Sequence, residues 1–368
     1  LMWMKENEPE ILSKTHKYVL IEDFINFMLC GEYATDYSMA SSTSLFDEKQ
    51  QKWSDELIDT AGIDKDLLCD AKPSGTVIGC VHSKASQKTG LAKGTPVVLG
   101  GHDYSCGCLP TGAFVPGVIL DVIGTWEMVV TSIDKPLLDM SLCNAEAVID
   151  SHVANGKWAI MVANVAGGMT EWFKSQFAYE EIKQADDEKL SQWHYLVKNA
   201  SARPVGANGV LFLPHMSGSS GPVVDPESTG AFVGLRNTHT RADMFRAVIE
   251  GINFQFLDII DNLKTVLDKT PEKIVAIGGP TRNELWMQTK ADISAKIMEI
   301  PEIDEPVTLG AAMLAGIGAG VYDDLTQAYE AVRKKVRVIE PNEKEHLKYI
   351  DIYHKYKKLY PALKGIRD

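Results

Sequence analysis

The sequence predicts an α/β protein built of two domains. Its 368 residues exceed what one ordinary core contains and suit two domains of about 100–250 residues each. Short apolar runs with strand character alternate with longer segments of helical periodicity, and several of these runs end in glycine. Strands interleaved with helices are typical of α/β layers. We expect the domain boundary near residue 114, which gives domains over residues 1–113 and 114–368.

Helices and a polar segment are expected in the first domain. Residues 1–30 carry two helical patterns, and Gly31 ends the second. The polar segment TDYSMASSTSLFD spans 35–47, and a short helix is expected over 55–60. Residues 95–101, TPVVLGG, have the pattern of a buried strand that runs into a glycine turn.

The second domain is expected to alternate strands and helices. Strand character recurs at 118–122, 158–162, 209–213 and 273–277. Two long helices are expected over 243–267 and 283–295, from their helical spacing of apolar residues. The apolar run 309–321 is shorter than the ~20 residues that cross a bilayer, so it predicts a packed internal helix.

Composition excludes some classes of function. The net charge of -13 disfavours binding to a nucleic-acid backbone, which requires clustered Lys and Arg. The start LMWMKENEPEI lacks the pattern of a secretory signal, and we expect no membrane association. No His/Cys group has the spacing of zinc ligands, so no protein metal site is predicted. We interpret the six cysteines as reduced thiols of a cytoplasmic protein.

Glycine turns after apolar strands are candidate phosphate sites. A peptide N–H can approach a phosphate oxygen where no Cβ intervenes, and a helix N-terminus adds a favourable dipole. The candidate turns are Gly100-Gly101, Gly124-Thr125, Gly167-Gly168 and Gly278-Gly279. A single turn of this kind usually only ends a strand, whereas several in one chain favour a nucleotide site. None has the spacing of a P-loop or of a dinucleotide-binding GxGxxG loop.

Asp103 is the candidate catalytic residue. It follows a buried strand and two glycines, where a core would take an apolar side chain. One interpretation is a helix N-cap. The other is a carboxylate that accepts a hydroxyl proton, as phosphoryl transfer to an alcohol requires.

Taken together, these segments resemble the FGGY family of carbohydrate kinases over nearly the whole chain. The resemblance is carried by LMWMKEN (1–7), TDYSMASSTSLFD (35–47), TGLAKGTPVVLGGHD (89–103), GVLFLPHMSGSSGPVVDPESTGAFVGL (209–235), GGPTRNELWMQTKADI (278–293) and EPVTLGAAMLAGIGAGVY (305–322). It implies two actin-like (ribonuclease-H-like) domains flanking a cleft, with the first domain incomplete at its N-terminus in this numbering.

The resemblance also implies the chemistry and the site. ATP with Mg²⁺ would phosphorylate a hydroxyl of a sugar or polyol, with Asp103 as the general base. The first candidate substrate is a ketose, namely a pentulose such as xylulose. His102, Asp103 and Tyr104 would lie at the sugar. The residues implied for the nucleotide are Gly124, Thr125, Gly167, Glu171, Gly278, Gly279 and Asn283. Dimers are common among symmetric soluble enzymes, so a homodimer is one candidate, while the sequence leaves the oligomeric state open.

Departures from the family pattern leave two alternatives open. The family's DxGTxxxR phosphate loop, which carries the aspartate that positions Mg²⁺, is expected upstream of Leu1. Tyr104 stands where Gln is frequent, and Trp126 stands where Ser is common. The first alternative is a non-catalytic relative that binds sugar or nucleotide and acts through domain closure. The second is an actin- or chaperone-type ATPase, which would hydrolyse ATP without a sugar.

Overall fold

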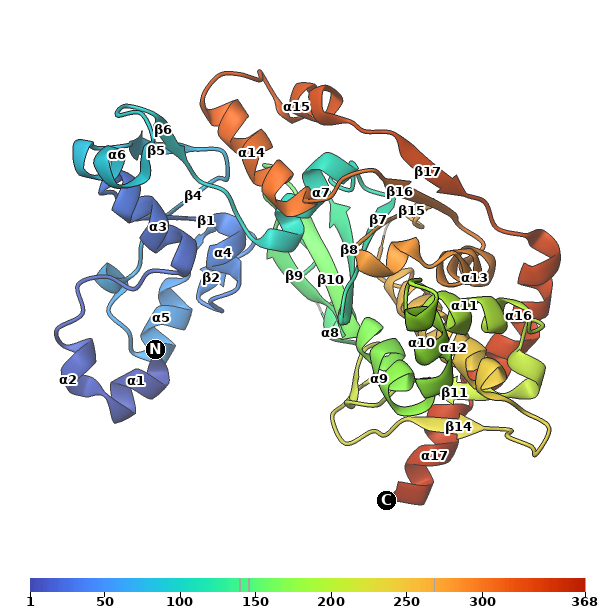
Figure 1. Cartoon of the computed structure of the whole chain (residues 1–368). Helices are drawn as coiled ribbons and strands as arrows, with labels where there is room; N and C mark the ends of the chain where they lie inside the picture. Colours follow the sequence, from blue (N-terminus) through green and yellow to red (C-terminus); the bar gives the residue numbers. More distant parts are fainter. Residues whose placement is uncertain (139, 145, 268, 368) are drawn as a thin grey trace.

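A computed structural model describes residues 1–138, 140–144, 146–267 and 269–367. The N-terminal elements form one lobe, and a large sheet with its helices forms the rest of the molecule (Figure 1). The lobe contains α1 (Met2–Asn7), α2 (Pro9–Leu12), α3 (Ile21–Cys30), β1 (Ala34–Asp36), α4 (Tyr37–Ser41), β2 (Phe46–Asp47), β3 (Lys52–Trp53), α5 (Asp55–Ala61), β4 (Asp70–Lys72), β5 (Val77–Cys80), α6 (Ser83–Thr89) and β6 (Pro96–Val98).

Sequence features determine where several lobe elements begin and end. Gly31 ends α3 in the left-handed conformation, with φ of 85°, as its position after the apolar pattern predicts. Asp36 caps α4 by accepting hydrogen bonds from the backbone of Ser38 and Met39. The helix predicted over 55–60 is α5, capped by the Ser54 hydroxyl.

The large sheet has seven strands in the order β17-β16-β15-β7-β8-β10-β9. At one side of the sheet each strand runs antiparallel to the next, in the order β7 (Val118–Ile123), β8 (Trp126–Ile133), β10 (Trp158–Val165) and β9 (Val148–Ser151). Strands β15 (Lys273–Ile277) and β16 (Ile297–Pro301) continue the sheet in parallel with β7, and β17 (Val336–Ile339) closes it antiparallel to β16.

Helices cover both faces of this sheet. The larger core lies against α9 (Gly167–Phe177), α12 (Arg241–Leu263) and α13 (Glu284–Ser294), and includes Ile119, Ile123 and Val129 from the strands. On the opposite face Leu120 and Val130 pack with residues of α7 (Asp103–Thr111). The alternation of side chains along β7 and β8 therefore separates two buried layers.

The remaining elements flank these layers on both sides or form the C-terminal region. Their bounds are α8 (Met140–Asn144), α10 (Tyr179–Asp187), α11 (His194–Ser201), β11 (Leu211–Leu213), β12 (Ser219–Ser220), β13 (Val224–Asp225), β14 (Ala231–Val233), α14 (Pro306–Gly318), α15 (Leu325–Val332), α16 (Glu343–Tyr356) and α17 (Leu359–Arg367), with short 3₁₀ turns at Lys65–Leu67, Ala207–Gly209 and Gly279–Arg282. No helix among the described residues is long and apolar enough to span a bilayer.

Helix α14 connects the two parts of the molecule. It lies with α7 between the N-terminal lobe and the sheet (Figure 1). A Cβ built on Gly310 would lie 2.0 Å from the carbonyl oxygen of Cys106 in α7. At the other end of α14, a Cβ on Gly318 would lie 2.7 Å from the carbonyl oxygen of Gly75. Glycine therefore allows both close contacts. The run predicted as an internal helix over 309–321 forms a helix over Pro306–Gly318 instead, in which Gly310, Met313 and Leu314 are buried.

Candidate active site

Asp103 is the first residue of α7, and its carboxylate faces solvent. The N-cap position belongs to His102, so the simple capping interpretation of Asp103 is wrong in detail. One carboxylate oxygen, Oδ1, accepts a hydrogen bond of 2.6 Å from the Tyr104 backbone N–H and lies 2.7 Å from Nδ1 of His102. The Asp103 side chain is 73% exposed, so it is accessible to a small substrate.

The polar segment 35–47 supports the backbone beneath Asp103. The Ser38 hydroxyl accepts a 2.8 Å hydrogen bond from the backbone N–H of His102 and also bonds the Asp36 carboxylate. Ser74 donates a further bond of 3.3 Å to Asp36. Burial raises the pKa of Asp36 to about 6, while its hydrogen bonds from Ser38 oppose this shift. These contacts fix the start of α7, and hence the position of Asp103.

Tyr104 points into the protein. Only 3% of it is exposed, and its hydroxyl donates a 2.6 Å hydrogen bond to Oδ2 of Asp150 on β9. Burial and the neighbouring Asp150 raise the pKa of Tyr104 far above its ordinary value. Its ring centroid lies 4.4 Å from that of His102. The hydroxyl that we expected at the sugar is thus engaged internally, and a direct contact stays a prediction.

The turn Gly124-Thr125 joins β7 to β8 and contacts the start of α9. The N–H of Gly167 donates to the carbonyl oxygen of Gly124 at 3.0 Å, and the N–H of Gly168 donates to that of Thr125 at 3.1 Å. A Cβ on Gly167 would lie 2.2 Å from the Gly124 carbonyl oxygen, so glycine is required there. Two glycine turns that are over 40 residues apart in sequence are therefore in direct contact.

The turn Gly278-Gly279 approaches the same place from β15. Gly278 has φ of 106°, and a Cβ on it would lie 2.1 Å from the carbonyl oxygen of Ile123. After the short 3₁₀ turn, Asn283 caps α13 by accepting a 3.2 Å hydrogen bond from the N–H of Trp286. The turn Gly278-Gly279 thus adjoins the end of β7, beside the turn Gly124-Thr125.

These turns line one cavity of about 870 Å³. Six of the seven residues predicted for the nucleotide border it, namely Gly124, Thr125, Gly167, Glu171, Gly279 and Asn283. Gly278 does not border the cavity, because it packs against the backbone of Ile123. The volume falls within the roughly 300–1,000 Å³ of small-molecule sites, which suits a nucleotide. None of the described residues 102–104 lines this cavity, so Asp103 lies outside it.

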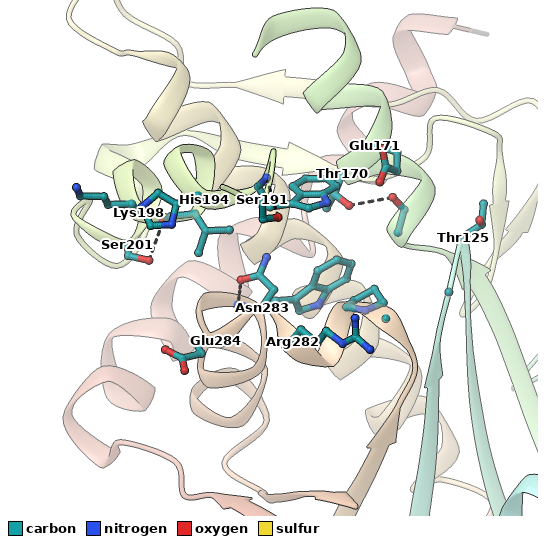
Figure 2. Close-up of a pocket in the computed structure, with 17 residues that line it drawn as sticks. Thr125, Thr170, Glu171, Ser191, His194, Lys198, Ser201, Arg282, Asn283 and Glu284 are labelled. Carbon is teal, nitrogen blue, oxygen red and sulfur yellow. Dashed lines mark hydrogen bonds between the residues drawn. The ribbon is translucent and has the colours of Figure 1, made fainter. Parts of the chain in front are cut away.

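One wall of the cavity was not predicted. It is formed by α11 and the residues before it, and Figure 2 shows Ser191, His194, Lys198 and Ser201 across from Arg282 and Asn283. Thr170 and Glu171 of α9 lie beside this wall, and the Glu171 carboxylate pairs with Lys174 at 2.7 Å. No glycine turn or sequence motif marks residues 191–201. Their polar and apolar residues at helical spacing were the only signal.

The described residues show no group of three or more His, Cys, Asp or Glu side chains arranged to hold a metal ion. The cysteines are unpaired: Cys30, Cys69, Cys80, Cys106, Cys108 and Cys143.

Comparison with solved structures identifies the class of protein. The xylulose kinase from Rhodospirillum rubrum matches with a TM-score of 0.89 and 25% identity, covering 99% of this chain and 71% of that one. The ligand-bound xylulose kinase from Lactobacillus acidophilus matches with a TM-score of 0.88 and 26% identity, over 99% of this chain and 71% of that one. The predicted α/β fold with two actin-like domains flanking a cleft is confirmed, and it is that of a carbohydrate kinase.

The sequence places the chain within one family. The FGGY family of carbohydrate kinases matches with its N-terminal domain over residues 1–110 and its C-terminal domain over 121–319. A xylulose kinase of Staphylococcus epidermidis is 30% identical over 370 residues, which cover 99% of this chain and 70% of the relative. An autoinducer-2 kinase of Escherichia coli is 29% identical, over 100% of this chain and 69% of the relative. The chain belongs to the FGGY family and is a carbohydrate kinase that phosphorylates a sugar with ATP.

Proposed function

We propose that this kinase phosphorylates a primary hydroxyl of an open-chain ketose, with a pentulose such as xylulose as the first candidate and Asp103 as the general base. The proposal is carried by one observation: an exposed carboxylate is held at the start of α7 by its neighbours, outside a cavity that is lined by three glycine turns. The similarity to xylulose kinases supports the pentulose.

In this mechanism Asp103 accepts the proton of the attacking hydroxyl. His102 hydrogen-bonds Oδ1 of Asp103 and would orient the carboxylate, and His102 and Tyr104 are retained as candidates for contact with the sugar. The hydroxyl oxygen then attacks the γ-phosphate in line, and ADP leaves. A base must lie within hydrogen-bond reach of the proton it removes, so closure of the two domains would bring sugar and ATP together and exclude water.

The nucleotide would occupy the cavity. The Thr125 hydroxyl would face the phosphates, and Gly124 and Gly167 would leave room for them because no Cβ stands there. The N–H groups of Gly124 and Gly167 themselves donate within the protein, to the carbonyl oxygens of Trp126 and Gly124. Gly278, Gly279 and Asn283 would hold the adenosine, and Glu171 would lie beside it. Mg²⁺ would enter with ATP and reduce the charge of its phosphates. We assign no residue of this chain to the metal.

The wider context is proposed from the same observations. The domain boundary lies between residues 113 and 114, which falls in the gap between the two family matches. Unpaired cysteines support a reducing compartment, and hence the cytoplasm. A homodimer is a candidate oligomer. The sugar is the small-molecule partner, and neither nucleic acid nor membrane is proposed as one.

Release of ADP by the full-length protein with MgATP, across ketoses, polyols and autoinducer-2, tests the function. Release that depends on one acceptor supports the proposal and identifies the substrate. Release without any acceptor would favour an ATPase. In parallel, Asp103→Asn should reduce turnover by about 10³-fold or more while ADP still binds, because the variant lacks only the base. An active Asp103→Asn enzyme would rule out the assigned role.

A further inference from the structure

Three charged side chains are fully buried beneath the turn Gly124-Thr125. Lys290 of α13 lies between Asp121 of β7 and Glu127 of β8, and the side chains of all three are 0% exposed. Nζ of Lys290 is 2.6 Å from Oδ2 of Asp121, and it also donates a hydrogen bond to Oε1 of Glu127. On its remaining side, the ammonium lies 4.0 Å from the centroid of the Phe256 ring.

A cluster of this kind is a costly way to fill a core. Removing ions from water costs several kcal/mol for each ion, and apolar residues of similar volume are often at least as stabilising. The cost is not fully offset here, because Oδ1 of Asp121 and Oε2 of Glu127 are buried without a hydrogen-bond partner. Stability alone is therefore a weak reason for these three residues.

Their position connects the two halves of the proposed nucleotide site. Asp121 and Glu127 stand on the two strands that carry Gly124-Thr125, one on each side of the turn. Lys290 stands on α13, which begins directly after Asn283. A single ammonium thus ties the strands of the phosphate turn to the helix of the adenosine loop.

We propose that Lys290, Asp121 and Glu127 are positioning residues that fix the phosphate turn relative to the adenosine loop. This inference rests on the proposed assignment of the two halves to phosphate and adenosine. A directional ion cluster fixes relative position better than apolar contacts, because its hydrogen bonds are lost when the strands and the helix shift. ADP, which spans both halves, depends on this geometry, whereas adenosine occupies only one half.

The groups of the cluster depend on one another's charge. Burial raises the pKa of Asp121, although the Lys290 ammonium opposes the shift. Burial acts to lower the pKa of Lys290, but the two carboxylates together raise it above its ordinary value. Removal of one partner alone would therefore leave the others buried without compensation.

The test compares the dissociation constants for ADP and adenosine in the full-length protein. The variant Asp121→Asn/Glu127→Gln/Lys290→Met removes every charge while it keeps side-chain volume nearly constant. We expect its affinity for ADP to fall about tenfold and its affinity for adenosine to change less than twofold. The matched control is Arg246→Met/Glu250→Gln, which removes another buried ion pair, of 2.9 Å, that does not line the cavity. It should leave both affinities unchanged.

Unchanged ADP affinity in the triple variant, or equal losses for ADP and adenosine, would overturn the positioning role. Equal binding of ADP and adenosine by the unmodified protein would overturn the nucleotide assignment itself, and the inference with it. If the triple variant does not fold, Glu127→Gln replaces it, because this change keeps the contact between Lys290 and Asp121. Its affinity for ADP should fall about threefold with adenosine unchanged, and an unaltered ADP affinity would again overturn the proposal.

Discussion

Replacing Gly167 with alanine should separate the two glycine turns that border the proposed phosphate site. The added Cβ would lie 2.2 Å from the carbonyl oxygen of Gly124 and 3.0 Å from its carbon. Carbon–oxygen contacts below about 3.3 Å are repulsive, so the backbones must move apart by about 1 Å. That movement breaks or weakens the hydrogen bonds from residues 166–168 to Gly124 and Thr125, which are 3.0–3.1 Å long.

The structure sets the size of the effect. Three backbone hydrogen bonds of about 1 kcal/mol each give an expected loss of about 2–3 kcal/mol in the free energy of unfolding. A displacement of about 1 Å in a positioning group costs up to about 10²-fold in turnover. We expect Gly167→Ala to unfold at lower denaturant concentration, to bind ADP more weakly, and to lose most of its activity.

A second alanine variant separates this effect from the general cost of replacing glycine. A Cβ on Gly100 would meet no atom within 4 Å, its φ is not left-handed, and Gly100 does not line the cavity. Gly100→Ala should therefore keep the stability and the ADP affinity of the unmodified protein. The reasoning fails if Gly167→Ala matches Gly100→Ala in both measurements, because the turns would then accommodate a Cβ without separating.

Three further changes test neighbouring features. Tyr104→Phe should cost about 1–3 kcal/mol of unfolding free energy, because it leaves the buried Asp150 carboxylate without its 2.6 Å hydrogen bond; an unchanged KM for the sugar would show that the hydroxyl makes no direct contact. Asn283→Ala removes the cap of α13 and should cost about 1 kcal/mol in denaturant unfolding and weaken ADP binding, whereas a weaker affinity without loss of stability would contradict the capping role. Burial raises the pKa of Asp23 from 3.8 to about 7, so the folded protein keeps a proton that the unfolded chain loses, and stability should fall as the pH rises from about 4 to 7. Asp23→Asn should flatten that slope in pH-dependent denaturation, and an unaltered slope would refute the assignment.

The sequence predicted the features that depend on short runs of residues. The strand over 273–277 is β15 with the same bounds, and three of the four candidate glycine turns border one cavity, whereas Gly100-Gly101 does not. That a nucleotide binds there stays a prediction. These turns could be predicted because only glycine allows two backbones to approach so closely, as at Gly167 and Gly278. The inference from Asp103 to the start of a helix was also sound, although His102 occupies the cap.

Features that depend on tertiary packing were missed. The wall formed by α11 has ordinary amphipathic sequence, and nothing local indicates that its polar residues face a cavity rather than solvent. The inward direction of Tyr104 depends on Asp150, which lies 46 residues later in the chain. The charges of Asp121, Glu127 and Lys290 become a cluster only when strands and helix are assembled. Spacing along the chain cannot show which distant side chains will share a core.

The glycines of α14 have a consequence for how the molecule can move. Side chains that interlock between helices resist rotation, because they must disengage before one helix can turn over the other. At Gly310 and Gly318 the backbone of α14 approaches the carbonyl oxygens of Cys106 and Gly75 so closely that no Cβ fits. Between these two points α14 also interlocks through side chains, because Met313 and Leu314 are buried in one cluster with Cys106 and Leu109 of α7. We therefore expect α7 and α14 to move as one unit, so that any closing motion of the lobe bends the chain elsewhere, and a methyl group at either glycine would push the packed elements apart.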